Sequence, residues 1–293
     1  MFIASSFDNL TTNLPVTFAT LFDLLKQNLI SSQPVSLGEW QSQTTDAQMR
    51  ELLHVVFEWK MPKTAADLAR ETGARLPWAE DHFLERVGGE PLNPSPSEAW
   101  WPFAKKGATT NADHKSEGEA FSHTYPERMW PKRANDGHTH PVVHKGEFLG
   151  HETNNHHGIR FEYGDLNDVI KQLEKSPHTR QAYLPIWFPE DTGAVHGKRV
   201  PCTLGYHFII RDGFLDVSYF MRSTDLLRHF QDDVYLAVRL AQWVVERLNE
   251  VSREEPQYHY QVGNLIFHTA NMHIFDSDVE MLKYWESQGR RWF

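Results

Sequence analysis

Apolar side chains at helical spacing predict helices in several parts of the chain. Residues 16–30 carry one such pattern. Residues 166–175 carry a shorter amphipathic pattern, and Ser176-Pro177 stops it because proline cannot continue a helix. The strongest pattern covers residues 234–249, with a stripe formed by Leu236, Leu240, Val244 and Leu248. These ranges are therefore expected to be helices.

Runs of apolar, β-branched and aromatic residues predict strands between these helices. The runs cover residues 182–188, 202–211, 214–221 and 262–274. Asp212-Gly213 predicts a tight turn between two of them. The apolar run over residues 48–59 fits a helix and a strand equally. Because no repeat or low-complexity linker interrupts these elements, we expect one α+β domain over residues 1–293, with a mixed or antiparallel sheet core and surrounding helices.

The stretch from 60 to 157 differs in composition from the rest. It is rich in Pro, Gly, Asn and His, and it includes the sequence Pro91-Leu92-Asn93-Pro94-Ser95-Pro96. Such residues favour turns and end regular elements. This stretch is therefore predicted to form loop-rich insertions, with loops and short helices laid on the core.

The overall composition is that of a globular protein with an acidic surface. Forty per cent of the 293 residues are apolar, which is enough for a large core. The net charge of −10 argues against general nucleic-acid binding, because a phosphate backbone requires a basic surface. A few arginines in one pocket can still bind a small anion.

The sequence also indicates where the protein works. It contains no run of apolar residues long enough for a membrane span, and its first residues lack the pattern of an export signal. The only cysteine, Cys202, cannot form a disulfide within one chain and fits a reducing compartment. We therefore expect a cytoplasmic protein.

Cys202 is the first candidate for chemistry. It follows Pro201, and Arg222-Ser223-Thr224-Asp225 begins twenty residues further on. A thiol followed by an arginine, hydroxyls and a carboxylate suggests a nucleophile with a site for an anion.

The order of motifs around Cys202 resembles the core of the thymidylate synthase family. In that family a Pro-Cys nucleophile precedes a hairpin, an Arg-Ser-x-Asp motif, a long helix and a His-x-Tyr motif. This chain has Pro201-Cys202, Arg222-Ser223-Thr224-Asp225, the predicted helix and His273-Ile274-Phe275 in the same order. Other segments agree with the family, namely Ser176 to Gln181 as its phosphate-arginine turn, Arg50-Glu51-Leu52-Leu53 as its catalytic Glu-Leu-Leu helix, and Tyr125 before Trp130. The likeness is good from about 160 to 280, thinner from 48 to 130, and absent from residues 1–45.

The resemblance implies a thymidylate synthase-like fold and a reaction at C5 of a pyrimidine nucleotide. Cys202 would add as a thiolate to C6, and the charge of Arg222 would lower the pKa of the thiol. Arg222 and Ser223 would hold the 5′-phosphate, with Arg180 reaching across from the partner in a homodimer. Tyr125 would lie near the nucleophile.

The resemblance also implies 5,10-methylenetetrahydrofolate as the cofactor. Asp225 and Trp78 would contact the folate. The one-carbon unit leaves an exocyclic methylene at C5, which takes a hydride to give methyl or water to give hydroxymethyl. We favour water, because the resembling branch of the family hydroxymethylates cytosine nucleotides. Glu51 would orient or deprotonate this water, with Asp233 and His273 completing its hydrogen bonds.

The base specificity is predicted from Asp233. It lies eleven residues after Arg222, where thymidylate synthases have an asparagine that recognises uracil. An ionised carboxylate only accepts hydrogen bonds, so it opposes uracil O4 but can accept from the 4-amino group of cytosine and from N3 once that nitrogen is protonated. A one-residue slip to Asp232 would again present a carboxylate. The predicted substrate is dCMP or CMP, as in the deoxycytidylate hydroxymethylase branch.

Several positions depart from the family. They are Met221, Thr203, Phe275 and Gln181, and Ser36-Leu37-Gly38-Glu39 stands where an Arg-Thr-Gly loop is expected. Phe275 removes a contact to the sugar, which leaves ribose and deoxyribose open.

Other functions stay open. A cytidylate methyltransferase or a thymidylate synthase acting on dUMP would use the same site. A non-catalytic nucleotide-binding relative would keep the pocket. A metal-dependent hydrolase could use a histidine cluster as ligands, although the folate reading assigns no metal; the cluster contains His138, His140, His144, His151, His156 and His157.

Overall fold

The computed structural model describes residues 2–3, 10–11, 17–36, 48–97, 123–133, 139–144, 147–153, 164–191, 200–251 and 259–288, with the backbone alone for residues 2–3, 10–11, 36, 139–144, 147–153, 190 and 285–286. The helices are α1 (Phe18–Ser31), α2 (Ala65–Thr72), α3 (Trp78–Val87), α4 (Tyr125–Met129), α5 (Leu166–Lys175), α7 (Phe230–Val251) and α8 (Asp276–Ser287), and Pro189–Asp191 forms a 3₁₀ turn. The strands are β1 (Phe2–Ile3), β2 (Leu10–Thr11), β3 (Pro34–Ser36), β4 (Gln48–Lys60), β5 (Thr139–His144), β6 (Glu147–Thr153), β7 (Tyr183–Pro185), β8 (Thr203–Arg211), β9 (Phe214–Asp225) and β10 (Gln261–Phe275).

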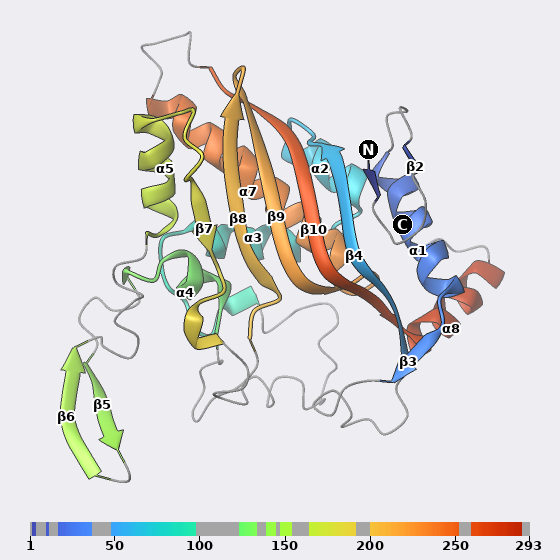
Figure 1. Ribbon diagram of the computed structural model, residues 1–293, viewed down its shortest axis with the longest axis horizontal. Coiled ribbons are helices and arrows are strands. Elements are labelled where there is room, and N and C mark those ends of the chain that lie inside the picture. Colours follow the sequence, from blue (N-terminus) through green and yellow to red (C-terminus); the bar gives the residue numbers. More distant parts are fainter. Residues whose placement is uncertain are drawn as a thin grey trace.

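A six-stranded mixed sheet in the order β3-β4-β10-β9-β8-β7 organises the fold (Figure 1). Its neighbours are antiparallel except β9 and β10, which are parallel. Parallel neighbours require a crossover, and α7 supplies it between the two strands. The sheet with its helices confirms the predicted α+β class.

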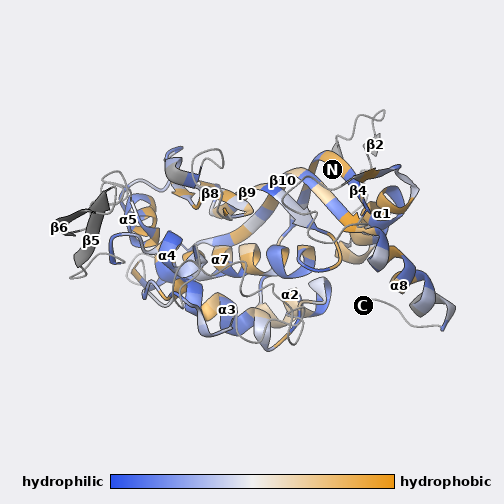
Figure 2. Cartoon of the chain, turned by 90° about the horizontal axis from the view of Figure 1, so that it is seen from below, coloured by the Kyte–Doolittle hydropathy of each residue, from blue (hydrophilic) through white to orange (hydrophobic). Residues whose placement is uncertain are grey.

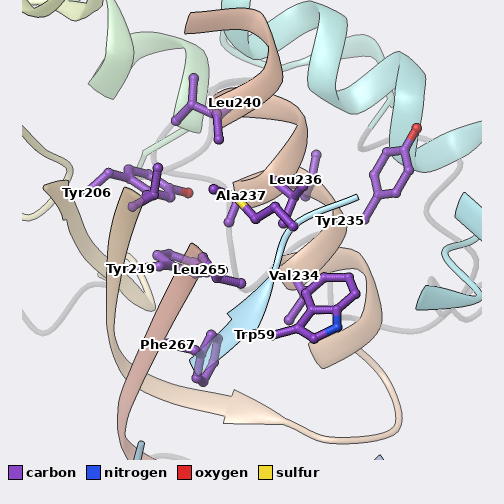
Figure 3. Packing of buried hydrophobic residues seen from close by; sticks show 14 of the residues in the cluster. Trp59, Tyr206, Tyr219, Val234, Tyr235, Leu236, Ala237, Leu240, Leu265 and Phe267 are labelled. Carbon is purple, nitrogen blue, oxygen red and sulfur yellow. The ribbon is translucent and has the colours of Figure 1, made fainter. Parts of the chain in front are cut away.

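The core lies between the sheet and α7. Figure 2 shows α2, α3 and α7 on one side of the sheet. Tyr206 and Tyr219 stack with ring centroids 4.7 Å apart, and Phe57 and Phe267 stack at 4.9 Å. Figure 3 shows Tyr206, Tyr219 and Phe267 of the sheet packed beside α7, where buried side chains include Val234, Leu236, Ala237 and Leu240.

Ion pairs fix α3 and its preceding loop to the outer side of α7. Tyr235 donates to Glu80 Oε2 at 2.6 Å, and Arg239 binds the same carboxylate at 2.9 and 3.0 Å. Arg75 pairs with Asp232 one turn earlier along α7. Although burial alone raises the pKa of Glu80, the hydrogen bonds from Arg239 and Tyr235 hold it below its usual value. The residues of α3 are thereby held in place relative to α7.

In the neighbouring strands β4, β9 and β10, the alternation of buried and more exposed side chains is interrupted at the same height in the sheet. In β9 the buried positions pass from Met221 to Thr224, and in β10 from Thr269 to Met272. β4 breaks at His54, which has a φ of 56°. These breaks are aligned, because Thr269 is paired with both Met221 and Val55. Such irregularities redirect side chains, and here they bring polar groups of neighbouring strands together.

The periodic helices and most strands were correctly predicted. The predictions over 16–30, 166–175 and 234–249 match α1, α5 and α7 within a few residues. Likewise, β8, β9 and β10 match their predicted runs, although β9 continues to Asp225. Within the described part of 60–157, α2, α3 and α4 agree with the expected short helices.

Other predictions were wrong or missing. The Glu-Leu-Leu helix implied at Arg50–Leu53 is part of β4, which pairs with β3 and β10 on its two sides. The predicted strand 182–188 is shortened to Tyr183–Pro185, because the N–H groups of Ile186 and Trp187 both donate to Leu204 O, which ends the regular pairing with β8. The β5–β6 hairpin and α8 were not predicted. In the described part of the chain, no helix has the length and apolar character needed to cross a membrane.

We expect Phe230→Ala to destabilise the protein strongly. Phe230 is fully buried, and its ring lies 5.4 to 5.9 Å from the rings of Phe18, Phe57 and Phe267. Removing such a ring leaves a cavity, and the free energy of unfolding should fall by about 3–5 kcal/mol in urea titrations. Phe214→Ala is the control, because Phe214 is 44% exposed. Equal losses in both variants would contradict this account of the core.

Candidate active site

Arg222 holds a fixed position beside the only thiol. Its Nε donates to the carbonyl of Pro201 at 2.9 Å and its Nη2 to that of Val200 at 3.1 Å. The same Nη2 lies 3.5 Å from Cys202 Sγ. The backbone N–H of Arg222 also bonds Cys202 O at 2.8 Å. A guanidinium held here stabilises a thiolate, so the structure brings these two predicted residues together.

Tyr125 reaches the residue next to the thiol. Its hydroxyl lies 3.2 Å from Thr203 Oγ1, which lies 2.9 Å from the hydroxyl of Tyr219. Burial and the charge of Cys202 raise the pKa of Tyr125 well above its usual value. Tyr125 is therefore a neutral hydroxyl close to Cys202, where the sequence predicted it.

Ser223, His273 and Glu51 are joined through Asn271. Asn271 Nδ2 donates to Glu51 Oε2 at 2.5 Å. Because that carboxylate fixes the amide, Asn271 Oδ1 faces His273 Nδ1 at 3.1 Å, and Nδ1 must carry the proton. Ser223 Oγ lies 3.2 Å from the same nitrogen. The network leaves Nε2 of His273 as an acceptor.

His273 is neutral at ordinary pH. Burial, with the charges of Arg228 and Arg222, lowers its pKa to about 4. Its ring also meets that of Phe275 edge-on at 5.6 Å. Phe275 therefore packs on the predicted site histidine.

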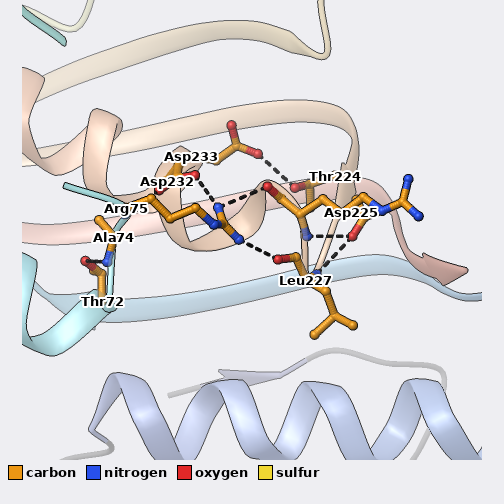
Figure 4. Close-up of polar contacts among 9 residues, drawn as sticks. Thr72, Ala74, Arg75, Thr224, Asp225, Leu227, Asp232 and Asp233 are labelled. Atoms are coloured by element: carbon orange, nitrogen blue, oxygen red, sulfur yellow. Dashed lines mark hydrogen bonds and ion pairs between the residues drawn. The ribbon is translucent and has the colours of Figure 1, made fainter. Parts of the chain in front are cut away.

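The two adjacent carboxylates at the start of α7 have different partners (Figure 4). Asp232 binds the guanidinium and backbone N–H of Arg75. Asp233 instead accepts from Thr224 Oγ1 at 2.8 Å, at the end of β9. Burial raises the pKa of Asp233 to about 7, against the lowering effects of the Thr224 hydrogen bond and the Arg86 charge. Of the two candidates, Asp233 is the one turned toward β9.

The residues predicted to contact folate are both buried. Asp225 Oδ1 accepts from the N–H groups of Leu227 and Arg228, each at 2.9 Å, and so shapes the turn into α7. Its Oδ2 makes no hydrogen bond within the described ranges, and burial raises the pKa of Asp225 to about 6. Trp78 donates to Ser97 O at 2.9 Å and stacks on His82. Their folate roles stay predictions.

Arg180 lies apart from these groups. It is exposed on the turn between α5 and β7, and its carbonyl lies 2.9 Å from His207 Nε2. A position on an exposed turn is compatible with the predicted contact to a partner subunit. The structure describes one chain, so that contact stays a prediction.

The histidine cluster is not tested by the structure. His138, His156 and His157 lie outside the described residues, as do the side chains of His140, His144 and His151. Leu37, Gly38 and Glu39 of the proposed loop also lie outside them. Among the residues that were described, no group of His, Cys, Asp and Glu could hold a metal ion.

Sequence reasoning missed Asn271 and a polar group on α3. His82 and Arg86 are buried, and Arg86 Nη2 lies 2.9 Å from His82 Nε2. Their spacing of four residues, one helical turn, could have indicated that the two side chains lie on the same face of a helix. The stretch was instead predicted to be mainly loops, because of its composition. Asn271 lay unmarked inside an apolar strand.

Comparisons with known proteins identify one family. The family model described as "Thymidylate synthase" matches residues 125–289. Thymidylate synthase of Enterobacteria phage T4 is 27% identical over 116 residues, covering 40% of this chain and 36% of that protein. A putative thymidylate synthase of Methanosarcina barkeri is 25% identical over 134 residues, covering 46% and 55%. The chain thus spans between about a third and a half of these relatives.

A solved structure shares the fold. Thermostable thymidylate synthase A from Bacillus subtilis matches with a TM-score of 0.57 over 92% of this chain and 83% of that one, at 16% identity. At this identity the likeness concerns the fold alone.

We expect Asp233→Asn to change how stability depends on pH. An acid whose pKa is about 7 when folded, against 3.8 ordinarily, is protonated in the native state between these values, so its contribution is present at low pH and lost as pH rises to about 7. Between pH 5 and pH 8 the unfolding free energy of the wild type, relative to the variant, should fall by on the order of 2 kcal/mol.

Asp67→Asn is the matched control for this titration. The pKa of Asp67 is lowered by its Thr64 and Arg70 hydrogen bonds, so removing it should leave the pH dependence between 5 and 8 unchanged. Parallel curves for the wild type and Asp233→Asn would refute the assignment.

Proposed function

Because the chain belongs to the thymidylate synthase family, we propose that it transfers a one-carbon unit to C5 of dCMP or CMP and that water completes the reaction, giving a 5-hydroxymethyl product. The family uses 5,10-methylenetetrahydrofolate as its one-carbon donor. The observation that carries the cytosine assignment is Asp233, a carboxylate that accepts a hydrogen bond from Thr224, two residues after Arg222 near the end of β9.

The first step is the addition of Cys202 Sγ to C6 of the pyrimidine. Arg222 supports it, since its guanidinium is locked beside the sulfur by the carbonyls of Val200 and Pro201. Within the described chain, Nη1 of Arg222 makes no hydrogen bond, and this donor can serve the 5′-phosphate together with Ser223.

Asp233 recognises the base. A carboxyl with a pKa of about 7 can donate its proton to N3 of cytosine and accept from the 4-amino group. When N3 takes the proton in the adduct, the carboxylate accepts from both groups. One acid thus complements the edge of cytosine before and after addition.

A second candidate substrate, dUMP, is favoured by the same raised pKa. The protonated form of Asp233 can donate to uracil O4 and accept from N3–H, which the ionised form cannot do. The choice between the bases therefore depends on how much Asp233 is ionised in the complex.

One group of this chain, the carboxylate of Asp225, suits a contact to the folate cofactor. Asp225 Oδ2 is a buried acceptor without a hydrogen bond among the residues described, and pterins carry N–H donors. Trp78 is already packed on His82 and bonded to Ser97. When bound, the cofactor supplies the one-carbon unit. This chain's own residues must then hold the water, and we assign that role to Glu51 and His273, which Asn271 connects, with Asp233 on the base.

We also propose a homodimer in which Arg180 completes the partner's phosphate site. α7 covers one face of the sheet. Phe220 of β9 and His268 of β10 stand at the alternate, half-buried positions of their strands, whose side chains point to the other face, and their two rings stack at 4.8 Å. A second copy would cover that face, and the exposed turn with Arg180 would then be available to it.

The substrate assay tests the reaction. The protein is incubated with the folate donor and dCMP, CMP or dUMP, and the products are weighed by mass spectrometry. We expect a hydroxymethyl increment on a cytidylate. A methyl increment would contradict the water step, and preference for dUMP would contradict the reading of Asp233.

Matched variants separate catalysis from binding in this assay. Cys202→Ser should abolish turnover but keep nucleotide binding, since only the nucleophile is lost. Asp233→Asn should shift preference toward dUMP by about tenfold or more. Turnover by Cys202→Ser would exclude the mechanism.

Subunit mixing tests the dimer. Arg180→Ala should weaken nucleotide binding by about tenfold or more through a lost charge-assisted contact. Mixed with inactive Cys202→Ser and assayed well below the Kd for nucleotide, where Arg180→Ala dimers turn over slowly, it should form hybrids with one intact site, restoring roughly a quarter of wild-type turnover after random exchange. Failure to restore turnover, although hybrids form, would place Arg180 outside the partner's site.

A further inference from the structure

Arg86 is a buried cation with an unsatisfied donor. It is 5% exposed, and its Nε makes no hydrogen bond in the described part of the chain. The guanidinium lies over the ring of Tyr125, with Cζ 3.9 Å from the centroid. A buried donor without a partner destabilises the fold, and more so when it is charged. Such a group suggests that a ligand supplies the acceptor.

A directed chain of hydrogen bonds fixes this guanidinium. Because arginine only donates, His82 Nε2 must accept from Nη2, and His82 Nδ1 then carries the proton toward Ser97 Oγ at 2.7 Å. Ser97 Oγ in turn donates to Glu85 Oε2 at 2.5 Å. Burial and the charge of Arg86 lower the pKa of His82 to about 4, in agreement with a neutral ring. The chain ends on a carboxylate and leaves Arg86 Nε uncommitted.

The position of Arg86 connects it with the proposed site. Tyr125, on which it stacks, bonds Thr203, the neighbour of Cys202 in the chain. The charge of Arg86 also acts on Asp233, where it opposes the effect of burial. Its helix is held against α7 by the Glu80–Arg239 ion pair, and Asp233 lies in the first turn of α7. Arg86 is therefore linked to Cys202 through Tyr125 and Thr203, and its charge acts on Asp233.

The proposed chemistry creates a charge that such a group can stabilise. When Cys202 Sγ bonds to C6, the π electron pair of C5=C6 moves toward C4 and N3. The sulfur loses its negative charge and no group leaves, and the ring carries that charge until N3 takes the proton of Asp233, whose carboxylate then holds it. A preorganised donor aimed at developing charge in a dry site lowers the barrier for this step.

We propose that Arg86 is a further catalytic residue, whose Nε–H stabilises the negative charge that the pyrimidine ring gains when Cys202 adds to C6. This assignment rests on the proposed function, because it requires a pyrimidine bound beside Cys202. His82, Ser97 and Glu85 are positioning residues that aim the guanidinium.

The test isolates the addition step from the folate reaction. Reversible addition at C6 makes C5 exchange its hydrogen with solvent, so exchange of the C5 hydrogen of dCMP in D₂O is followed by NMR without any folate. Arg86→Met and Arg86→Lys should slow exchange by about 10²–10³-fold and tenfold or more, respectively, since lysine keeps the charge but not the Nε donor. The Kd for dCMP should change by less than about threefold, because a donor used only after addition contributes little to ground-state binding.

Arg128→Lys is the matched control. Arg128 is equally buried but pairs with Asp191 at 2.6 Å, and lysine preserves that charge. Its exchange rate should equal that of the wild type.

The outcomes are distinguishable. Exchange by Arg86→Met at the wild-type rate would overturn the proposal while leaving the proposed function intact. Loss of dCMP binding together with exchange in both Arg86 variants would show a structural role and also overturn it. If the wild type exchanges C5 hydrogen in none of dCMP, CMP and dUMP, the proposed function itself fails.

Discussion

The parallel pairing of β9 and β10 is the constraint on which the site depends. Parallel neighbours cannot be joined by a tight turn, so the chain leaves β9 at Asp225, runs through α7 across the sheet, and returns as β10. The exit turn is held by Asp225 Oδ1. It places the first turn of α7, with Asp233, against Thr224. The same pairing sets Asn271 beside Ser223.

Burial gives otherwise similar groups different roles. Asp232 and Asp233 are adjacent, but Asp232 forms an ion pair with Arg75. Asp233 instead accepts a hydrogen bond from the hydroxyl of Thr224, and the charge of Arg86 acts on it without a direct ion pair. Only the second is left with a pKa of about 7. His82 and His273 are both held neutral by burial and nearby arginines. The site therefore combines neutral acceptors with guanidinium groups that other residues hold in place.

The sequence allowed prediction of those elements that depend on local periodicity and short-range turns. The stripe of α7 and the hairpin of β8 and β9 were readable because apolar spacing and the Asp212-Gly213 turn act over short distances. The type of element that contains Glu51 could not be predicted, because its apolar run fits a helix and a strand equally. The long-range pairing with β10 makes it a strand. Arg86 was missed for a related reason. Its burial depends on the docking of α3 on α7, which Glu80 and Arg239 establish across a long sequence separation.

The charge distribution explains how an acidic protein can bind an anion. The net charge is −10, yet Arg222 and Arg86 are held by carbonyls and by a histidine instead of by carboxylate partners. Their charges are thus not neutralised locally, whereas Arg75 and Arg128 are paired with aspartates. Uncompensated guanidinium groups near a thiol and a carboxyl with a raised pKa favour a ligand that brings negative charge. A nucleotide monophosphate brings such charge in its phosphate, and its ring gains more during thiolate addition.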